Sequence, residues 1–359
     1  DMLNPPSILH YSSGFPMVIG LHHVEDYKEI KVADPSQRMI FKRDDGSEVQ
    51  GVGVMHGYHH YVITTRPRCM FSRESFYWFA DQKKAVGELE FEVGYKDWKR
   101  VPFELFLDGK TSPYPLPLSE RIPTPDHIRH VEIAGGPMGH PNRLLIHGQG
   151  GSIGLFLEPD LLHFIRVDDS SWPACLDFRI EYIGISTGLK GQRDYADRLW
   201  NHEKVRAIAG LLQRDAPNLQ VYVFGYQASY IIEPVPGRFI TGSGILEARI
   251  GMPDFAEVLE ATLIGHFRPA FNEEFEAFPH DDPPHWMNTL RDTVRPAYEP
   301  PGQALLSVVL ASDNRHNPEG AWTFGRFYTD HTRLHGTATD LCTITIDLSA
   351  TNAQADRTR

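Results

Sequence analysis

The sequence lacks the features that mark membrane-bound and secreted proteins. No stretch approaches the roughly 18 consecutive apolar residues that a membrane-spanning helix needs. The three cysteines, Cys69, Cys175 and Cys342, are far apart and odd in number, so they suit neither a disulfide framework nor a closely spaced pair of metal ligands. The first residues do not have the basic-then-apolar order of a signal peptide. We therefore expect a cytoplasmic protein without a membrane partner.

Positive charge is also scarce. The 359 residues include 35 Lys and Arg against 47 Asp and Glu, which gives a net charge of −12 at pH 7. Duplex DNA is bound largely through cations that neutralise its phosphates. Nucleic-acid binding by this chain would therefore need a local basic patch or a basic partner subunit. The other proportions, 41% hydrophobic and 11% aromatic residues, are ordinary for a globular protein.

Two common catalytic motifs are missing as well. The glycine-rich stretch GQGGSIG (148–154) lacks the Lys-Ser/Thr pair of a phosphate-binding loop, and no serine lies in a Gly-x-Ser-x-Gly context. Histidines in HGYHH (56–60) and HDDPPH (280–285) are of metal-ligand type, but their spacing in strands or loops does not define a zinc site. The stretch FYWFA (76–80) is aromatic enough to stack on bases, although core packing is the commoner use of such residues.

Hydrophobic patterning divides the chain into three regions. Residues 1–155 alternate apolar and polar residues and have a hairpin signal at Asp45-Gly46, which predicts a β-rich N-terminal domain. Residues 156–276 alternate between strand and helix patterns. Residues 277–359 contain further strand-like segments and end in a polar tail. We expect the middle region to carry the chemistry and the flanks to assist it.

The middle region predicts a compact α/β unit. Short apolar segments at 161–167, 178–186 and 219–227 have the length and composition of strands. Helical periodicity extends over 193–215 and over 253–269, and prolines lie close to the ends of both helices. The order is β-β-α-β-α, so the expected fold class is α/β with β-rich flanking regions.

Both predicted helices carry polar side chains that are candidates for a binding or catalytic role. Arg198, His202 and Arg206 recur every four residues and share one helix face, which would either bind a phosphate or face solvent. Glu260 falls within the apolar arc of the second helix, where a carboxylate must be paired, protonated or bound to a metal. An ion pair with Arg198 or another arginine and a metal site in a cleft both meet that requirement. The apolar face expected to pack on the core in the first helix comprises Ala196, Leu199, Trp200, Ala207, Ile208, Leu211 and Leu212.

Four features follow one another along the middle region: the tripeptide Tyr182-Ile183-Gly184 in a strand, Arg198 followed by His202 in a helix, Glu260 in a second helix, and the stretch LIGHFRPAFN that closes at Asn272. In this order they resemble the GIY-YIG nuclease family. The resemblance covers about residues 160–276. The strand at 161–167 would take the place of the family's first strand, with Ile165 near the position of that strand's tyrosine.

The resemblance implies a role for each of these residues. One divalent cation, Mg²⁺ or Mn²⁺, would be held by Glu260 and a phosphate oxygen. Arg198 would grip the scissile phosphate as a fork of N–H donors. Tyr182 would orient or deprotonate the attacking water, and His202 would accept a proton or contact the phosphate. Asn272 would position the end of the helix that carries the metal ligand.

The implied function is that of a metal-dependent endonuclease, a hydrolase that cuts phosphodiester bonds. DNA is the expected substrate ahead of RNA, a flanking domain would choose the target, and restriction or anti-phage defence is the expected setting. A protein partner or a homo-oligomer is compatible with this function. The alternative is a catalytically degenerate scaffold of the same fold, which binds nucleic acid or a partner protein without cutting. A third interpretation is a β-rich binding protein in which the match to the motif arises by chance.

Overall fold

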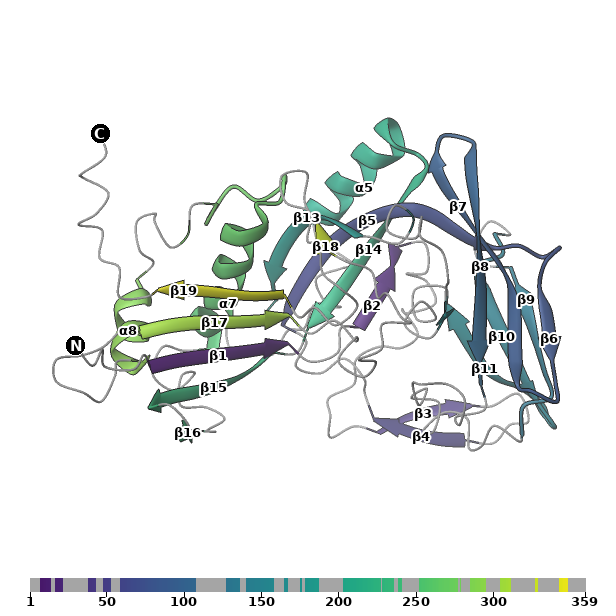
Figure 1. The fold of residues 1–359 in the computed structure, drawn as a ribbon, viewed down its shortest axis with the longest axis horizontal. Helices are drawn as coiled ribbons and strands as arrows, with labels where there is room; N and C mark the ends of the chain where they lie inside the picture. The colour runs from purple at the N-terminus through teal and green to yellow at the C-terminus, as the bar shows by residue number, and fades with distance from the viewer. Residues whose placement is uncertain are drawn as a thin grey trace.

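Strands dominate the computed structural model of the chain, and a few helices pack on them (Figure 1). This mixture agrees with the expected α/β class. No helix in the part of the chain that the structure describes is long and apolar enough to cross a bilayer. The described residues are 7–13, 17–21, 38–42, 48–52, 59–107, 127–135, 140–157, 165–166, 175, 178–186, 203–226, 228–235, 238–240, 252–276, 278, 285–294, 304–310, 327–328 and 342–347.

The largest sheet is built around one long strand, β5 (His60–Phe71), which appears as a curved ribbon in Figure 1. The first part of β5 lies between β13 (Phe178–Ile185) and β14 (Leu219–Tyr226), and both neighbours are antiparallel to it. The last four residues of β5 pair instead with β7 (Lys84–Gly94). A single strand therefore connects the part of the sheet that holds Tyr182 to a second part with its own core.

Five further strands complete this sheet of nine strands. They are β8 (Asp97–Phe106) and β6 (Tyr77–Phe79), which pair with β7; β12 (Ile165–Arg166), which pairs with β8; β2 (Met17–Gly20), which pairs with β14; and β18 (Phe327–Tyr328), which pairs in parallel with β13.

A three-stranded sheet packs against the second part of the large sheet. It comprises β9 (His130–Ala134), β10 (Arg143–Gly148) and β11 (Gly151–Leu157), with β10 in the middle. Alternate residues of the facing strands form one apolar core, which also contains Cys69 and Cys175. Burial raises the pKa of Cys69 to about 12, so its thiol stays protonated and packs as an apolar group.

The third large element is a five-stranded sheet in which β1 is central. Its order is β16 (Arg238–Ile240), β15 (Ala228–Val235), β1 (Ser7–Ser13), β17 (Ala304–Leu310) and β19 (Cys342–Asp347).

The predicted hairpin at Asp45-Gly46 is confirmed by the antiparallel pair β3 (Arg38–Lys42) and β4 (Glu48–Val52). Both large sheets combine strands from residues 1–155, 156–276 and 277–359.

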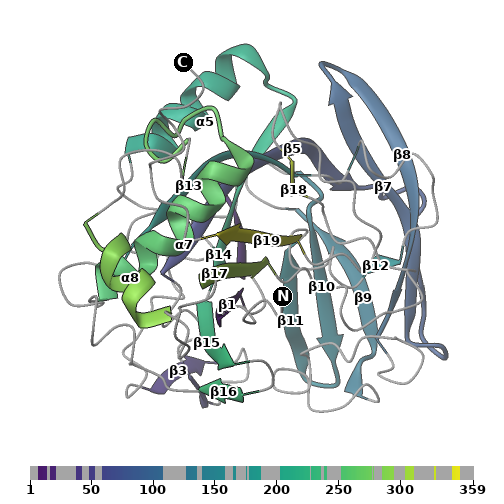
Figure 2. The same ribbon diagram turned by 60° about the vertical axis from the view of Figure 1, so that its left-hand side comes forward.

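Helix α7 (Met252–Phe267) confirms the helix predicted at 253–269 and lies across β13 (Figure 2). Most of its described side chains are buried, because β13 lies against one side and the chain at Phe275 and Phe278 packs closely against Gly265 on another. Helix α8 (Met287–Val294) is shorter and contacts β1 and β17. The buried residues of α7 include Ala256, Val258, Leu259, Ala261, Thr262, Leu263, Ile264 and Phe267.

Helix α5 (Glu203–Asp215) is the described part of the helix predicted at 193–215. Its buried residues are Val205 and Ile208, of which only Ile208 belonged to the expected core face. Ala207 and Leu211 are exposed, so the expectation that they pack on the core was wrong. The helix contacts β14 through a narrow strip, and a helical wheel cannot show how wide the contact with a sheet will be.

Candidate functional site

Two tyrosines face each other on the neighbouring strands β5 and β13. The ring centroids of Tyr61 and Tyr182 are 6.1 Å apart, and the ring planes are tilted by 36°. Tyr61 is only 1% exposed, whereas Tyr182 is half-buried. Tyr182 therefore keeps part of its surface open to solvent, while Tyr61 supports it from the enclosed side.

The strand beside Tyr182 is not the one that the sequence predicted. Residues 165–166, the described part of the predicted strand 161–167, pair with β8. β5 lies next to β13 instead, so Tyr61 and not Ile165 is the neighbour of Tyr182. The expectation for Ile165 was therefore wrong. Sequence reasoning missed Tyr61 because it lies in the N-terminal region; its one signal is the β-branched run that follows it, which suits a strand buried on both faces.

The glycine of Tyr182-Ile183-Gly184 is required by close packing of the two rings. A Cβ atom at Gly184 would lie 2.6 Å from Tyr61 Oη and 2.7 Å from Tyr182 Cε1. We expect Gly184→Ala to lower the free energy of unfolding by about 1–3 kcal/mol, because the rings of Tyr61 and Tyr182 must shift to make room for the added methyl group. Urea denaturation measures the change.

The control for this substitution is Gly210→Ala in α5, where an added Cβ meets nothing within 4 Å. We expect this control to raise the free energy of unfolding by about 0.5–1 kcal/mol, since alanine favours a helix more than glycine does. A Gly184→Ala protein as stable as the wild type would show that the two rings do not enclose the glycine.

Asn272 binds the middle residue of the same tripeptide. The backbone N–H of Ile183 donates to Asn272 Oδ1 at 2.9 Å, and Asn272 Nδ2 donates to the Ile183 carbonyl at 2.9 Å. The N–H of Phe271 also donates to the carbonyl of Glu181 at 3.2 Å. The side-chain amide thus continues the backbone hydrogen bonding of the sheet. These bonds fix the segment after α7 against β13 and satisfy polar groups that are buried there.

The start of α5 approaches the same segment. Lys204 Nζ lies 3.5 Å from the carbonyl oxygen of Phe271 and 3.5 Å from Glu273 Oε1. Arg198 and His202 lie outside the described residues, which resume at Glu203. The beginning of α5, the segment at 271–273 and the Tyr182 strand are therefore brought together by contacts that the structure describes.

Glu260 lies on α7, the helix that packs on β13. Its side chain is half-buried, as is that of Glu257 nearly one turn earlier. A second contact ties α7 to the sheet, since His60 Nε2 on β5 lies 3.0 Å from the Ala256 carbonyl and must donate to it. The N-terminal half of α7 is thus held against β5, and the segment directly after the helix is held against β13 by Phe271 and Asn272.

The fit of a divalent cation rests on one carboxylate. Within the described residues, no group of three or more His, Cys, Asp or Glu side chains gathers where it could hold a metal ion. Mg²⁺ commonly keeps several waters and binds through one or two carboxylates together with phosphates of the substrate. A site of this kind needs only one carboxylate from the protein, which is the role that the resemblance implies for Glu260. A cage built only of protein atoms is not found in this part of the chain.

A buried carboxylate lies directly beside Tyr182. Glu181 is 3% exposed, and its Oε1 accepts a hydrogen bond from Thr65 Oγ1 at 2.8 Å. Arg179 Nε lies 3.3 Å from the same oxygen. The negative charge is thus compensated within the sheet. Thr65 and Arg179 thus provide the partners that a buried carboxylate needs.

Comparison of the chain with protein-family models, with curated proteins and with solved structures found no match. The class that the fold defines is a mixed α/β protein dominated by strands. Any more specific assignment depends on the residues and contacts described above.

Proposed function

We propose that the chain is a metal-dependent nuclease with a GIY-YIG-like core, which hydrolyses phosphodiester bonds of nucleic acid. The observation that carries the proposal is the placement of Tyr61 and Tyr182 on adjacent antiparallel strands with their rings 6.1 Å apart. The resemblance implies a pair of tyrosines, and in this proposal Tyr61 on β5 is the partner of Tyr182 that the middle region lacks.

In this proposal the core consists of β5, β13, α5, β14 and α7. Chain order then gives β-β-α-β-α, with the first strand contributed by the N-terminal region. The sheet order β14-β5-β13 places that first strand in the centre. The contacts of Lys204 and Asn272 support the proposal, because Lys204 joins the start of α5 to the segment after α7 and Asn272 joins that segment to the tyrosine strand.

The chemistry requires a water nucleophile, a grip on the phosphate and compensation of negative charge. Tyr182, the more accessible tyrosine, would orient or deprotonate the water, and Tyr61 would hold its ring in place. Arg198 would bind two phosphate oxygens, and His202 would accept a proton. A cation on Glu260, when bound, would neutralise phosphate charge and stabilise the leaving oxygen.

A second candidate is a scaffold that binds nucleic acid or a partner protein without cutting. The observation in its favour is an exposed acidic run directly after Asn272, formed by Glu273, Glu274 and Glu276. The side chain of Glu273 is 87% exposed. Carboxylates near the proposed site would repel phosphates and weaken the approach of a substrate.

A cleavage assay tests the proposal. Purified chain is incubated with plasmid DNA, single-stranded DNA and RNA, each with Mg²⁺, with Mn²⁺ and with EDTA. We expect products with either cation and none with EDTA, and we expect DNA to be cut in preference to RNA. Intact substrate under every condition would leave the non-cutting scaffold as the better proposal. Cleavage in the presence of EDTA would show that the reaction does not require a divalent cation.

A further inference from the structure

The tip of the β7–β8 hairpin presents aromatic side chains to solvent. Tyr95 is 68% exposed, and Val93 and Trp98 are each 37% exposed. These three are half of the six large hydrophobic residues that are exposed in the described part of the chain. A concentration of exposed apolar surface on one small element indicates a binding site.

The same tip carries positive charge in a chain whose net charge is −12. Residues 93–100 include Lys96, Lys99 and Arg100 against the single acid Asp97. Arg100 is compensated by Glu90 at 3.0 Å and Glu88 at 3.7 Å, so the remaining charges of the tip are those of Lys96 and Lys99 against that of Asp97. Lys96 Nζ lies 5.1 Å from the centroid of the Tyr95 ring. Cations next to exposed rings suit a ligand with both negative charge and aromatic faces.

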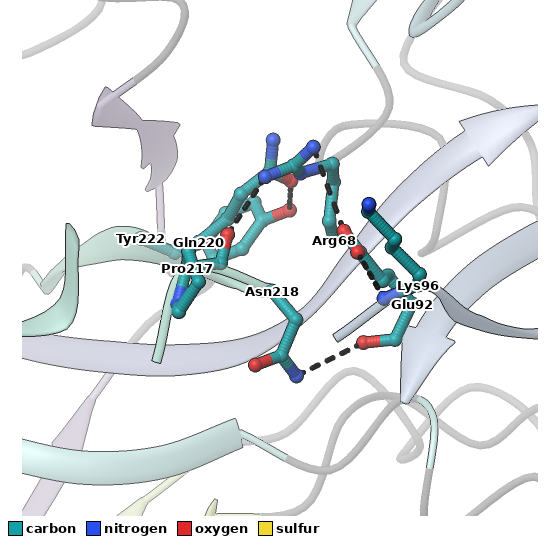
Figure 3. A network of polar contacts seen from close by, with 7 residues as sticks. All are labelled: Arg68, Glu92, Lys96, Pro217, Asn218, Gln220 and Tyr222. Atoms are coloured by element: carbon teal, nitrogen blue, oxygen red, sulfur yellow. Dashed lines mark hydrogen bonds and ion pairs between the residues drawn. The ribbon is translucent and has the colours of Figure 1, made fainter. Parts of the chain in front are cut away.

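The tip is held rigidly by the buried carboxylate of Glu92 (Figure 3). The backbone N–H of Lys96, whose φ of 61° is left-handed, donates to Glu92 Oε1 at 2.9 Å. Arg68 Nη1 lies 3.5 Å from Glu92 Oε2, and Asn218 Nδ2 donates to the Glu92 carbonyl at 3.1 Å. Arg68 also donates to the Pro217 carbonyl at 2.7 Å. Because the tip is already ordered, binding to it loses little conformational entropy.

These anchors connect the tip to the candidate functional site through α5. Pro217 and Asn218 lie two and three residues after Asp215, the last residue of α5, and Figure 1 shows the hairpin beside that end. The opposite end of α5 contacts Phe271, next to Asn272. The 13 residues of α5 span about 20 Å.

We propose that the hairpin tip, residues 93–100, is a contact site for single-stranded nucleic acid. Tyr95 and Trp98 stack on bases, and Lys96 and Lys99 bind phosphates. Single strands are favoured over duplexes because base faces are open to aromatic side chains only where the bases are not stacked inside a helix. The inference rests on the proposed function for the identity of the ligand, but it concerns binding and requires no cleavage.

Fluorescence anisotropy with a labelled 12-nucleotide single strand tests the inference, with EDTA present so that nothing is cut. We expect Tyr95→Ala and Trp98→Ala each to weaken binding by about tenfold, and Trp98→Phe to retain most of the affinity. The double variant Lys96→Gln/Lys99→Gln should weaken binding. It should also reduce the slope of the logarithm of the binding constant against the logarithm of the salt concentration by about 1.4, or about 0.7 for each cation. A duplex of the same sequence should bind more weakly than the single strand.

Tyr77→Ala is the matched control, since Tyr77 is 59% exposed and lies on β6 of the same sheet, away from the tip. It should leave the affinity unchanged. The inference would be overturned by any of four results. Tyr95→Ala and Trp98→Ala could leave the affinity unchanged, or Tyr77→Ala could lower it equally. Duplex and single strand could bind equally well, or the wild-type chain could bind no nucleic acid. If the tip binds the single strand but nothing is cut in Mg²⁺, the inference stands and the proposed nuclease activity is refuted. If the chain cuts nucleic acid but the tip variants bind it as well as the wild type, the nuclease proposal stands and the inference is refuted.

Discussion

We expect Glu260→Gln to reduce the rate of nucleic-acid cleavage by about 10²–10³-fold. Glutamine keeps the size of the side chain but loses the charge that would attract Mg²⁺. A catalytic metal ion is worth several kcal/mol of transition-state stabilisation, and each 1.36 kcal/mol is tenfold in rate. Glu260 is half-buried on a helix that packs on the tyrosine strand, so urea denaturation of the variant is needed to show that the fold is retained.

The chain provides a matched control for this prediction in Glu257→Gln. Glu257 is the same residue type on the same helix and is also half-buried. Initial rates across a Mg²⁺ titration, together with urea denaturation of both variants, separate a metal ligand from a structural acid. Only Glu260→Gln should lose activity and need more Mg²⁺. A wild-type rate in Glu260→Gln would remove it from the site, and equal losses in both variants would indicate a general perturbation of α7.

We expect the free energy of unfolding to fall by about 3 kcal/mol as the pH is lowered from about 6.5 to about 4, through His60 alone. His60 is 5% exposed, and its Nε2 donates to the Ala256 carbonyl at 3.0 Å. Its Nδ1 is buried and has no hydrogen-bond partner among the described residues. Burial disfavours the charged ring and lowers the pKa of His60 to about 4, with a smaller contribution from the neighbouring His59.

The sign of this dependence follows from which state binds the proton. In the unfolded chain His60 is protonated below its ordinary pKa of 6.5, whereas in the folded chain it stays neutral down to about pH 4. Between these values the unfolded state binds more protons, so stability rises with pH and is lost as the pH falls. Urea denaturation across this range measures the slope.

His60→Gln should flatten the slope, because glutamine keeps a donor for the Ala256 carbonyl but does not titrate. The same replacement at His59, which lies beside it and whose Nδ1 is 3.2 Å from the Ser186 carbonyl oxygen, should retain most of the slope. An unchanged slope in His60→Gln would show that another group is responsible for the acid sensitivity.

The local elements of the middle region could be predicted because their signals are local. The strands around Tyr182 and at 219–226 and helix α7 lie within one or two residues of their predicted bounds. Their lengths, prolines and apolar periods act within a few residues of chain. The same periodicity gives the apolar arc of the second helix, and in α7 the residues Val258, Leu259, Leu263, Ile264 and Phe267 are buried.

The partners of these elements could not be predicted in the same way. The pairing of β13 with β5 depends on hydrogen bonds between segments that are far apart in the chain, and no local pattern states which strand will lie beside which. The sequence therefore contained no indication that Tyr61 and Tyr182 would lie on neighbouring strands. The anchoring of the hairpin tip through Glu92, Arg68 and Asn218 is of the same kind, since each residue belongs to a different segment.

The sequence by itself determined the strand that carries Tyr182-Ile183-Gly184, the apolar helix that carries Glu260 and the closing segment that ends at Asn272. Only the tertiary structure decided that Tyr61 would face Tyr182, that Asn272 would bind Ile183, and that an aromatic, basic hairpin would be fixed to the end of α5. The reason is physical: backbone propensity and hydrophobic period act over a few residues, whereas strand pairing and the satisfaction of buried polar groups are settled only when distant segments meet.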